Sequence, residues 1–173
     1  SYVITSQSEL INNVVPLLDS YKFFTIKELQ YNYFKSALQI RPQTSTEIGF
    51  IKERMKAIKF NYSYVPSTYY EMPSKSWLVG FVEAEGSFSL TKNSSVRGTY
   101  RHRFVLSQKK DSFLLEKIRQ SLGIDTVVFT RIDNKTCKYV ESKVEAHNLK
   151  DLLFVAEYFK NCFVGVKATE FEM

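Results

Sequence analysis

Two glutamates stand two positions apart at the end of an apolar run, in the segment WLVGFVEAEGSF (residues 77–88). Positions two apart on a helix point about 200° from each other, so the carboxylates of Glu83 and Glu85 cannot chelate one ion together. Glu85 precedes Gly86 at the predicted helix end, where the helix dipole disfavours an anion by about 0.3–1 kcal/mol. A divalent cation held by oxygen ligands would offset that cost, and a solvated acid is the alternative. One of the two glutamates must therefore have a different role.

The same segment predicts a contact between two helices. Gly80 and Ala84 are four positions apart and therefore lie on one helix face, where small side chains let a neighbouring backbone approach closely. Leu78 and Val82 flank this face and complete the predicted helix interface.

A weak internal repeat relates residues 14–34 to residues 154–173 at a constant offset of 140 positions. Each copy predicts an amphipathic helix, a short loop with an apolar plug, and a second helix that begins near a lysine. The matched pairs are Phe23 and Phe163, Ile26 and Val166, Lys27 and Lys167, and Tyr31 and Phe171.

The hydrophobic periodicity predicts the elements that position these residues. The first part contains a helix over 45–60. From Trp77 the pattern predicts a helix to Glu85, strands near 87–93 and 99–107, a helix from Asp111 to Leu122 ended by Gly123, strands near 126–132 and 136–144, and a helix from about 147. This order is α-β-β-α-β-β-α, and residues 1–40 supply only the last strand, helix and following helix of another such unit.

The motif LVGFVEAEGSF resembles the LAGLIDADG motif of homing endonucleases and their maturase relatives. FVLSQKKDSFLLEKIRQSLGI (104–124) is similar to the second strand and following helix of that family. VVPLLDSYKFFTIK and EYFKNCFVGVK are similar to its helix-loop-lysine element. The resemblance covers essentially the whole chain and is nearest in character to mitochondrial, intron-encoded members with two fused repeats, which implies a mitochondrial location.

The resemblance implies an α+β fold of αββαββα repeats whose antiparallel, saddle-shaped sheets lie on DNA while the motif helices of two repeats pack together. We expect residues 1–60 to be the C-terminal part of a first repeat, 61–74 a linker, and 75–173 a second repeat, with truncation of its last helix left open. A counterpart of Glu85 would lie about 55 residues upstream of Ser1, at the same offset of 140.

The resemblance also assigns catalytic residues. It implies that Glu85 binds Mg²⁺ at the scissile phosphate, with Glu83 as the preceding motif acid. Gln108 would organise solvent, Lys167 would lie near the cleaved phosphate, and Lys27 would be its equivalent in the first repeat. Phosphodiester hydrolysis needs an activated water, a Lewis acid and stabilisation of the leaving oxygen, and these residue types can provide them.

The strands carry a predicted nucleic-acid surface. Arg101 and Arg103 alternate with Tyr100, His102 and Phe104, so one strand face is basic and the other largely apolar or aromatic. The net charge of +6 makes a polyanionic partner plausible. Ordinary solvated strand residues are the alternative for each position. The predicted nucleic-acid-binding residues are Ser87, Ser89, Thr91, Arg101, Arg103, Arg131, Lys138 and Lys143.

Three functions remain open because the chain contains one acidic motif and such an active site needs two. The first is site-specific, Mg²⁺-dependent cleavage of double-stranded DNA. The second is binding of structured RNA as an intron-splicing maturase. The third is a structural role in a ribonucleoprotein particle such as the mitochondrial ribosome. A zinc site and a membrane partner are not expected, since Cys137 and Cys162 are far apart and no apolar run reaches membrane-spanning length.

Overall fold

The computed structural model describes residues 3–40, 44–59, 66–92, 98–109, 111–133 and 138–172. The chain divides into two compact units, Ser1–Glu71 and Met72–Met173. The boundary falls inside the predicted linker. In the described part of the chain, every helix is too short or too polar to cross a bilayer.

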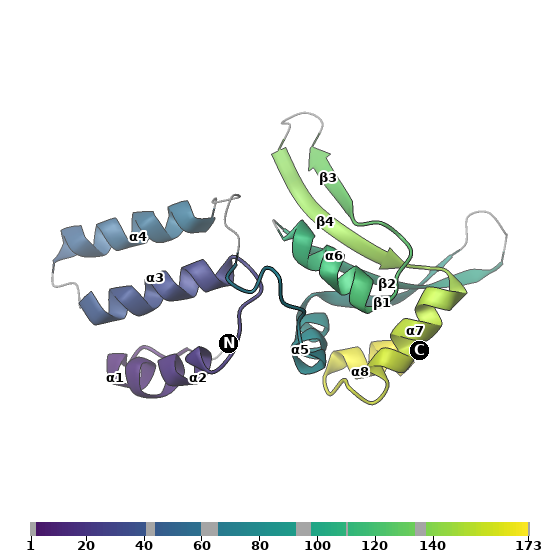
Figure 1. Cartoon of the computed structure of the whole chain (residues 1–173), viewed down its shortest axis with the longest axis horizontal. Helices are drawn as coiled ribbons and strands as arrows, with labels where there is room; N and C mark the ends of the chain where they lie inside the picture. Colours follow the sequence, from purple (N-terminus) through teal and green to yellow (C-terminus); the bar gives the residue numbers. More distant parts are fainter. Residues whose placement is uncertain are drawn as a thin grey trace. The chain divides into compact units, whose positions relative to one another are not determined.

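The first unit is helical in its described residues (Figure 1). The predicted helix over 45–60 is present, but the strand expected at the start of the chain is not formed by residues 3–6. Ser6 instead caps the first helix, since its hydroxyl accepts a hydrogen bond from the Glu9 backbone nitrogen. A strand also needs a neighbouring strand for its backbone hydrogen bonds, and the described residues of this unit supply none. Its elements are α1 (Gln7–Glu9), the π-helical turn η1 (Leu10–Val14), α2 (Val15–Asp19), α3 (Lys27–Ile40) and α4 (Ser45–Lys59).

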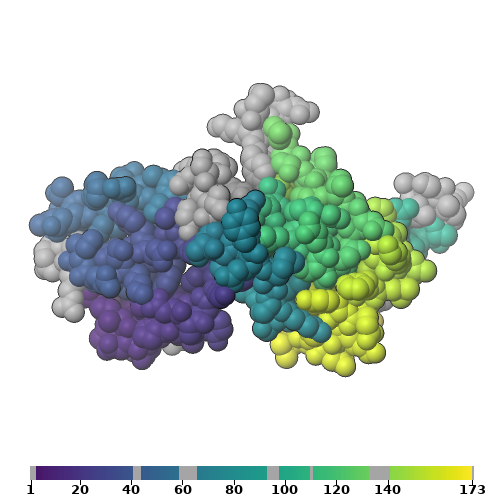
Figure 2. Space-filling model, viewed as in Figure 1, coloured from purple at the N-terminus to yellow at the C-terminus, as the bar shows by residue number. Residues whose placement is uncertain are grey.

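The second unit has the predicted order of elements around an antiparallel four-stranded sheet with the strand order β1-β2-β4-β3. Helices α5, α6, α7 and α8 all reach the face of this unit that Figure 2 shows. The elements are α5 (Lys75–Glu85), β1 (Gly86–Lys92), β2 (Tyr100–Gln108), α6 (Ser112–Ser121), β3 (Phe129–Asp133), β4 (Lys138–Ala146), α7 (Leu149–Phe159) and α8 (Val166–Glu172). The α+β prediction is confirmed.

The bounds of two elements follow from a glycine turn and from one hydrogen bond between distant residues. Helix α6 ends as predicted next to Gly123, whose φ of +59° suits glycine at a helix C-terminus. Strand β3 begins at Phe129, three residues later than predicted. The Asp125 backbone nitrogen donates to the Asp151 carboxylate at the start of α7, 3.0 Å away, so this part of the chain is tied to a helix before it joins the sheet.

The core lies on one face of the sheet, because side chains alternate along each strand. Phe104 and Leu106 of β2 are fully buried. The Phe104 ring lies 6.3 Å from that of Phe159 on α7 and 5.1 Å from that of Phe88 on β1. Each fully buried side chain of this size contributes about 1.5–3 kcal/mol. Helices therefore cover one sheet face, and the other face remains for polar residues.

The internal repeat is visible as two equivalent aromatic pairs. The Phe23 and Tyr31 rings stack at 5.0 Å, and the Phe163 and Phe171 rings, 140 positions later, meet edge to face at 5.5 Å. In each copy the aromatic residue in the loop packs on the second helix. The predicted apolar plug is therefore present in both units.

The turn that opens each second helix is closed by the same backbone hydrogen bond. Glu28 donates to Thr25 at 3.1 Å, and Ala168 donates to Gly165 at 3.0 Å, again 140 positions apart. The weak sequence repeat thus corresponds to a repeated local structure.

Candidate active site and nucleic-acid interface

Helix α5 has one buried face and one open face. Leu78 and Val82 are buried in the core of their own unit, which corrects their predicted place in an interface with another helix. Gly80 and Ala84 are exposed, and a Cβ atom added at Gly80 would meet nothing within 4 Å in the described residues. The surface of α5 open to a second helix is therefore that of Gly80 and Ala84.

Gly86 makes the sharp junction between α5 and β1. Its backbone nitrogen donates to the Val82 carbonyl, and a Cβ atom at this position would lie 2.6 Å from that oxygen. Such a contact is too short for any other residue without a local shift. The strand consequently begins immediately after Glu85, whose exposed side chain stands at the end of α5.

Glu83 holds the loop before α8. Its Oε1 atom accepts hydrogen bonds from the backbone nitrogens of Val164 (2.9 Å) and Gly165 (3.2 Å). The carboxylate therefore lies at the start of α8, where the helix dipole favours an anion. This contact gives the first motif acid a structural role and leaves Glu85 exposed.

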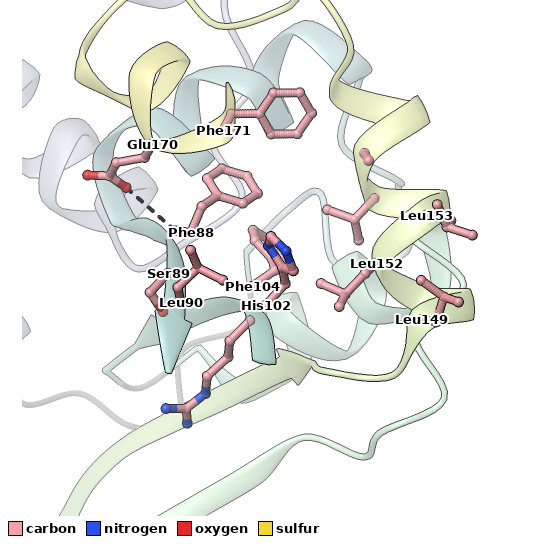
Figure 3. Close-up of a pocket in the computed structure, with 13 residues that line it drawn as sticks. Phe88, Ser89, Leu90, His102, Phe104, Leu149, Leu152, Leu153, Glu170 and Phe171 are labelled. Atoms are coloured by element: carbon pink, nitrogen blue, oxygen red, sulfur yellow. Dashed lines mark hydrogen bonds between the residues drawn. The ribbon is translucent and has the colours of Figure 1, made fainter. Parts of the chain in front are cut away.

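Lys167 is tied to the sheet through an ion pair. Its Nζ atom lies 2.7 Å from Oε2 of Glu170, and only 15% of the lysine side chain is exposed. The same glutamate oxygen accepts a long hydrogen bond from the Phe88 backbone nitrogen, 3.5 Å away (Figure 3). The hydrogen bond from Lys167 lowers the pKa of Glu170 below its ordinary value. Contact between Lys167 and a phosphate would require this lysine to exchange its partner.

Gln108 lies at the same end of the sheet as Glu85. Gly86 pairs with Leu106, so the end of β2 that carries Gln108 adjoins the α5–β1 junction. The half-buried Gln108 side chain accepts a hydrogen bond from the Lys109 backbone nitrogen at 3.0 Å. Lys27 lies in the first unit, exposed at the first position of α3.

The sheet face away from the helices carries the predicted polar surface. Ser89 pairs with Arg103 and Thr91 with Arg101, and Ser87 lies two positions further along the same face. The prediction that these residues share a face is confirmed by the register. Arg101 is exposed and forms no ion pair with any residue that the structure describes.

An acid lies in the middle of this face, and sequence reasoning missed it. The Arg103 guanidinium donates to both carboxylate oxygens of Glu145, with 2.6 Å between Nη2 and Oε2. Lys143 Nζ lies 2.9 Å from the same Oε2 atom. The hydrogen bond from Arg103, helped by Lys143, lowers the pKa of Glu145 to about 2, although burial opposes the shift. Lys143 and Glu145 were two positions apart in the sequence, but the contact with Arg103 is diagonal across two strands and depends on register.

The remaining predicted surface residues lie towards the far end of the sheet. Arg131 on β3 pairs with Glu141 at 3.1 Å. The backbone of Lys138 pairs with Asp133 at the start of β4, and its side chain lies outside the described residues.

An apolar pocket of about 310 Å³ lies on the helix-covered side of the unit (Figure 3). Phe88, Leu90 and His102 line it from the strands, and Leu149 and Leu152 line it from α7. The residues that line it do not include the predicted catalytic residues. It is therefore distinct from the exposed acid at the end of α5.

The described residues contain no group of three or more histidine, cysteine or acidic side chains that would surround a metal ion. Hard divalent cations take six or more oxygen ligands. Glu85 supplies one carboxylate, so the described part of this chain does not build a complete site. A metal would need further oxygens from another helix, a phosphate or water.

A family model described as LAGLIDADG endonuclease matches residues 78–172, more than half of the chain. The chain belongs to the LAGLIDADG endonuclease family. The match includes the motif end at Glu85, the whole sheet and α8.

Two curated proteins and one solved structure are similar to this chain. "Probable intron-encoded endonuclease Cox1-I1b" of Schizosaccharomyces pombe is 30% identical over 95% of this chain and 44% of its own length. "Uncharacterized mitochondrial protein RF1" of Saccharomyces cerevisiae is 30% identical over 64% of this chain and 23% of its own length. The I-SmaMI LAGLIDADG homing endonuclease bound to cleaved DNA has a TM-score of 0.72 and 22% identity, covering 98% of this chain and 63% of that one. The chain thus spans less than half the length of these curated relatives.

Proposed function

We propose that this chain provides one motif helix and one DNA-binding sheet of a LAGLIDADG homing endonuclease that cleaves double-stranded DNA at a specific site. The observation that carries the proposal is the end of α5. There, the exposed Glu85 adjoins an open face of small residues, Gly80 and Ala84, on which a second motif helix would pack. Residues 1–60 would be the C-terminal part of the other repeat, and the repeated loop and turn support this assignment.

The polar face of the sheet would contact the duplex. The described helices of this unit cover the other face of the sheet. Arg101 and Ser87 are exposed on the polar face, and Ser89 and Thr91 are half-buried on it. The DNA major groove admits a two-stranded β-ribbon such as β1 and β2, and phosphate contacts by arginine would position it.

The residues of this chain would divide the catalytic work. When bound, Mg²⁺ would supply Lewis acid chemistry at the scissile phosphate, held by Glu85 and an acid of the second motif. Gln108, at the same end of the sheet, would orient water. Lys167 would stabilise phosphate charge after exchanging its partner Glu170. Lys27 would be the equivalent lysine of the other repeat.

The test uses the full-length natural protein and a library of randomised duplexes, so that no target sequence has to be assumed. We expect Mg²⁺-dependent cleavage of a subset of the library by the unchanged protein. Glu85→Gln should keep duplex binding and lose cleavage by at least two orders of magnitude, since oxyanion or metal stabilisation of this kind is worth about 10²–10³ in rate. Glu157→Gln on α7 removes the same charge from an exposed position and should cleave normally.

Equal cleavage by Glu85→Gln and the unchanged protein would contradict the catalytic assignment. Binding of structured RNA with no cleavage of any duplex would instead support the maturase role, and stable recovery in a ribonucleoprotein particle would support the structural role. We also propose a mitochondrial location, which the similarity to a mitochondrial and an intron-encoded protein supports.

A further inference from the structure

We infer that Glu145 is an internal counter-ion that competes with nucleic-acid phosphates for Arg103 and Lys143, and that it thereby limits sequence-independent binding by the polar face of the sheet. This inference rests on the proposed function, because it assigns a role to an acid on the proposed nucleic-acid surface.

The geometry of the contact shows how firmly both cations are held. Arg103 reaches Glu145 with two parallel hydrogen bonds, the arrangement that guanidinium and carboxylate groups form most strongly. Lys143 adds a third donor at 2.9 Å. Only 21% of the Glu145 side chain is exposed, so the carboxylate is partly shielded from water. Removing either cation would leave a half-buried charge with fewer partners, which is unfavourable.

The charge pattern of the face shows what a polyanion would meet. Four cations with described side chains project from it, and two acids lie among them. Arg101 alone of the four has no ion pair within the described residues. Arg103 and Lys143 share Glu145, and Arg131 is paired with Glu141. A DNA backbone of arbitrary sequence would therefore gain contact with Arg101 readily, but would have to displace Glu145 to reach Arg103 and Lys143.

Such competition separates specific from non-specific contacts. The DNA backbone offers the same phosphate acceptors at every sequence. Binding therefore gains little free energy when a phosphate replaces the Glu145 carboxylate, which already accepts two hydrogen bonds from Arg103. A guanine edge presented at the right place offers two acceptors to the planar guanidinium, as Glu145 does. Arg103 would be released only where the sequence supplies an equivalent partner.

A purely structural ion pair is the competing explanation, and salt dependence distinguishes the two. Each phosphate contact changes the slope of log K against log salt concentration by about 0.9 for duplex DNA. If Glu145 keeps Arg103 and Lys143 from phosphates, Glu145→Gln should make this slope steeper by about one to two units. The affinity for a duplex of random sequence should rise several-fold. An ion pair that serves only the fold would change thermal stability and leave the slope alone.

The experiment measures fluorescence anisotropy of a 30-base-pair duplex of random sequence, and retention on heparin, across a range of salt concentrations. Glu145→Asp keeps the charge and should remain close to the unchanged protein. Glu157→Gln is the matched control, since it adds the same unit of net charge from exposed α7 and should not alter the slope by one unit. Thermal unfolding verifies that each variant is folded.

A second pair of variants tests the inference should Glu145→Gln fail to fold. Arg101→Ala should reduce the slope by about 0.9, whereas Arg103→Ala should reduce it by clearly less, because Arg103 is already neutralised. Equal reductions for both arginines would overturn the inference.

The outcomes also separate this inference from the proposed function. If the unchanged chain binds the duplex and Glu145→Gln matches Glu157→Gln, the inference is overturned and the proposed function stands. If neither the unchanged chain nor Glu145→Gln binds duplex or heparin at low salt, both are overturned. Binding that appears only in Glu145→Gln would support the inference and contradict duplex binding by the unchanged chain.

Discussion

The Oε1 atom of Glu83 lies 2.9 Å from the backbone nitrogen of Val164, so the motif helix holds the loop before α8 across 81 positions of sequence. The second motif acid, Glu85, has a different environment, since it is exposed at the end of the same helix. The two glutamates are two positions apart in the sequence, but they point to opposite sides of α5 and therefore have different contacts.

We predict that Glu83→Gln lowers the free energy of unfolding by about 1 kcal/mol. Glutamine keeps the acceptor oxygen but loses the charge that strengthens both hydrogen bonds and complements the start of α8. Glu85→Gln should leave stability unchanged or slightly raised, because an anion at a helix C-terminus is unfavourable. Urea unfolding of both variants measures the difference. Equal loss of stability in Glu83→Gln and Glu85→Gln would mean that the contact between Glu83 and the loop before α8 does not stabilise the fold.

The two glycines of the motif should respond oppositely to alanine. Gly86→Ala places a Cβ atom 2.6 Å from the Val82 carbonyl oxygen, and the local shift that relieves this contact should cost about 1–3 kcal/mol. Gly80→Ala meets nothing within the described residues and should stabilise the helix by up to about 1 kcal/mol. Thermal unfolding of the isolated chain provides the comparison, and a Gly86→Ala variant as stable as Gly80→Ala would contradict the predicted clash.

Stability at acid pH should depend on Glu145. Its pKa is lowered from 4.5 to about 2 in the folded chain, chiefly by Arg103 and then by Lys143, and His147 Nδ1 lies 4.0 Å from its Oε1 atom. The folded state therefore binds this proton less readily than the unfolded state does. The resulting stabilisation, about 1–3 kcal/mol, is fully present above pH 4.5 and is lost as pH falls towards 2.

The variant Glu145→Gln isolates this contribution from those of the other acids. The difference in unfolding free energy between the unchanged chain and the variant should shrink between pH 4.5 and 2, as followed by urea unfolding at each pH. A difference that stays constant over this interval would show that the ion pair is not formed as described.

Several elements were predictable because their signals are local. Alternating side chains along residues 100–108 predicted the strand and its two faces, and Gly123 predicted the end of α6. The 140-residue offset predicted the paired loops, since the same aromatic plug recurs in each copy. The motif itself predicted a helix that ends at Glu85.

Other predictions failed or were incomplete because they depend on distant partners. Leu78 and Val82 have the side chains expected of a helix interface, but the sheet of their own unit buries them. The repeat predicted a strand at the start of the chain. The described residues of that unit contain no other strand with which it could pair. The contact between Arg103 and Glu145 requires the register of β2 against β4.

The sequence by itself therefore determined the helix that presents two acids and the alternation that makes one strand face polar. It also determined the family of the chain. These features follow from side-chain spacing along a helix or strand, and that spacing is a property of the local backbone. Only the tertiary structure decided that Glu83 binds the loop before α8 and that Gly80 and Ala84 remain exposed. It also decided that Glu145 lies in the middle of the polar face of the sheet. Each of these depends on which residues far apart in the chain become neighbours when the apolar core is buried.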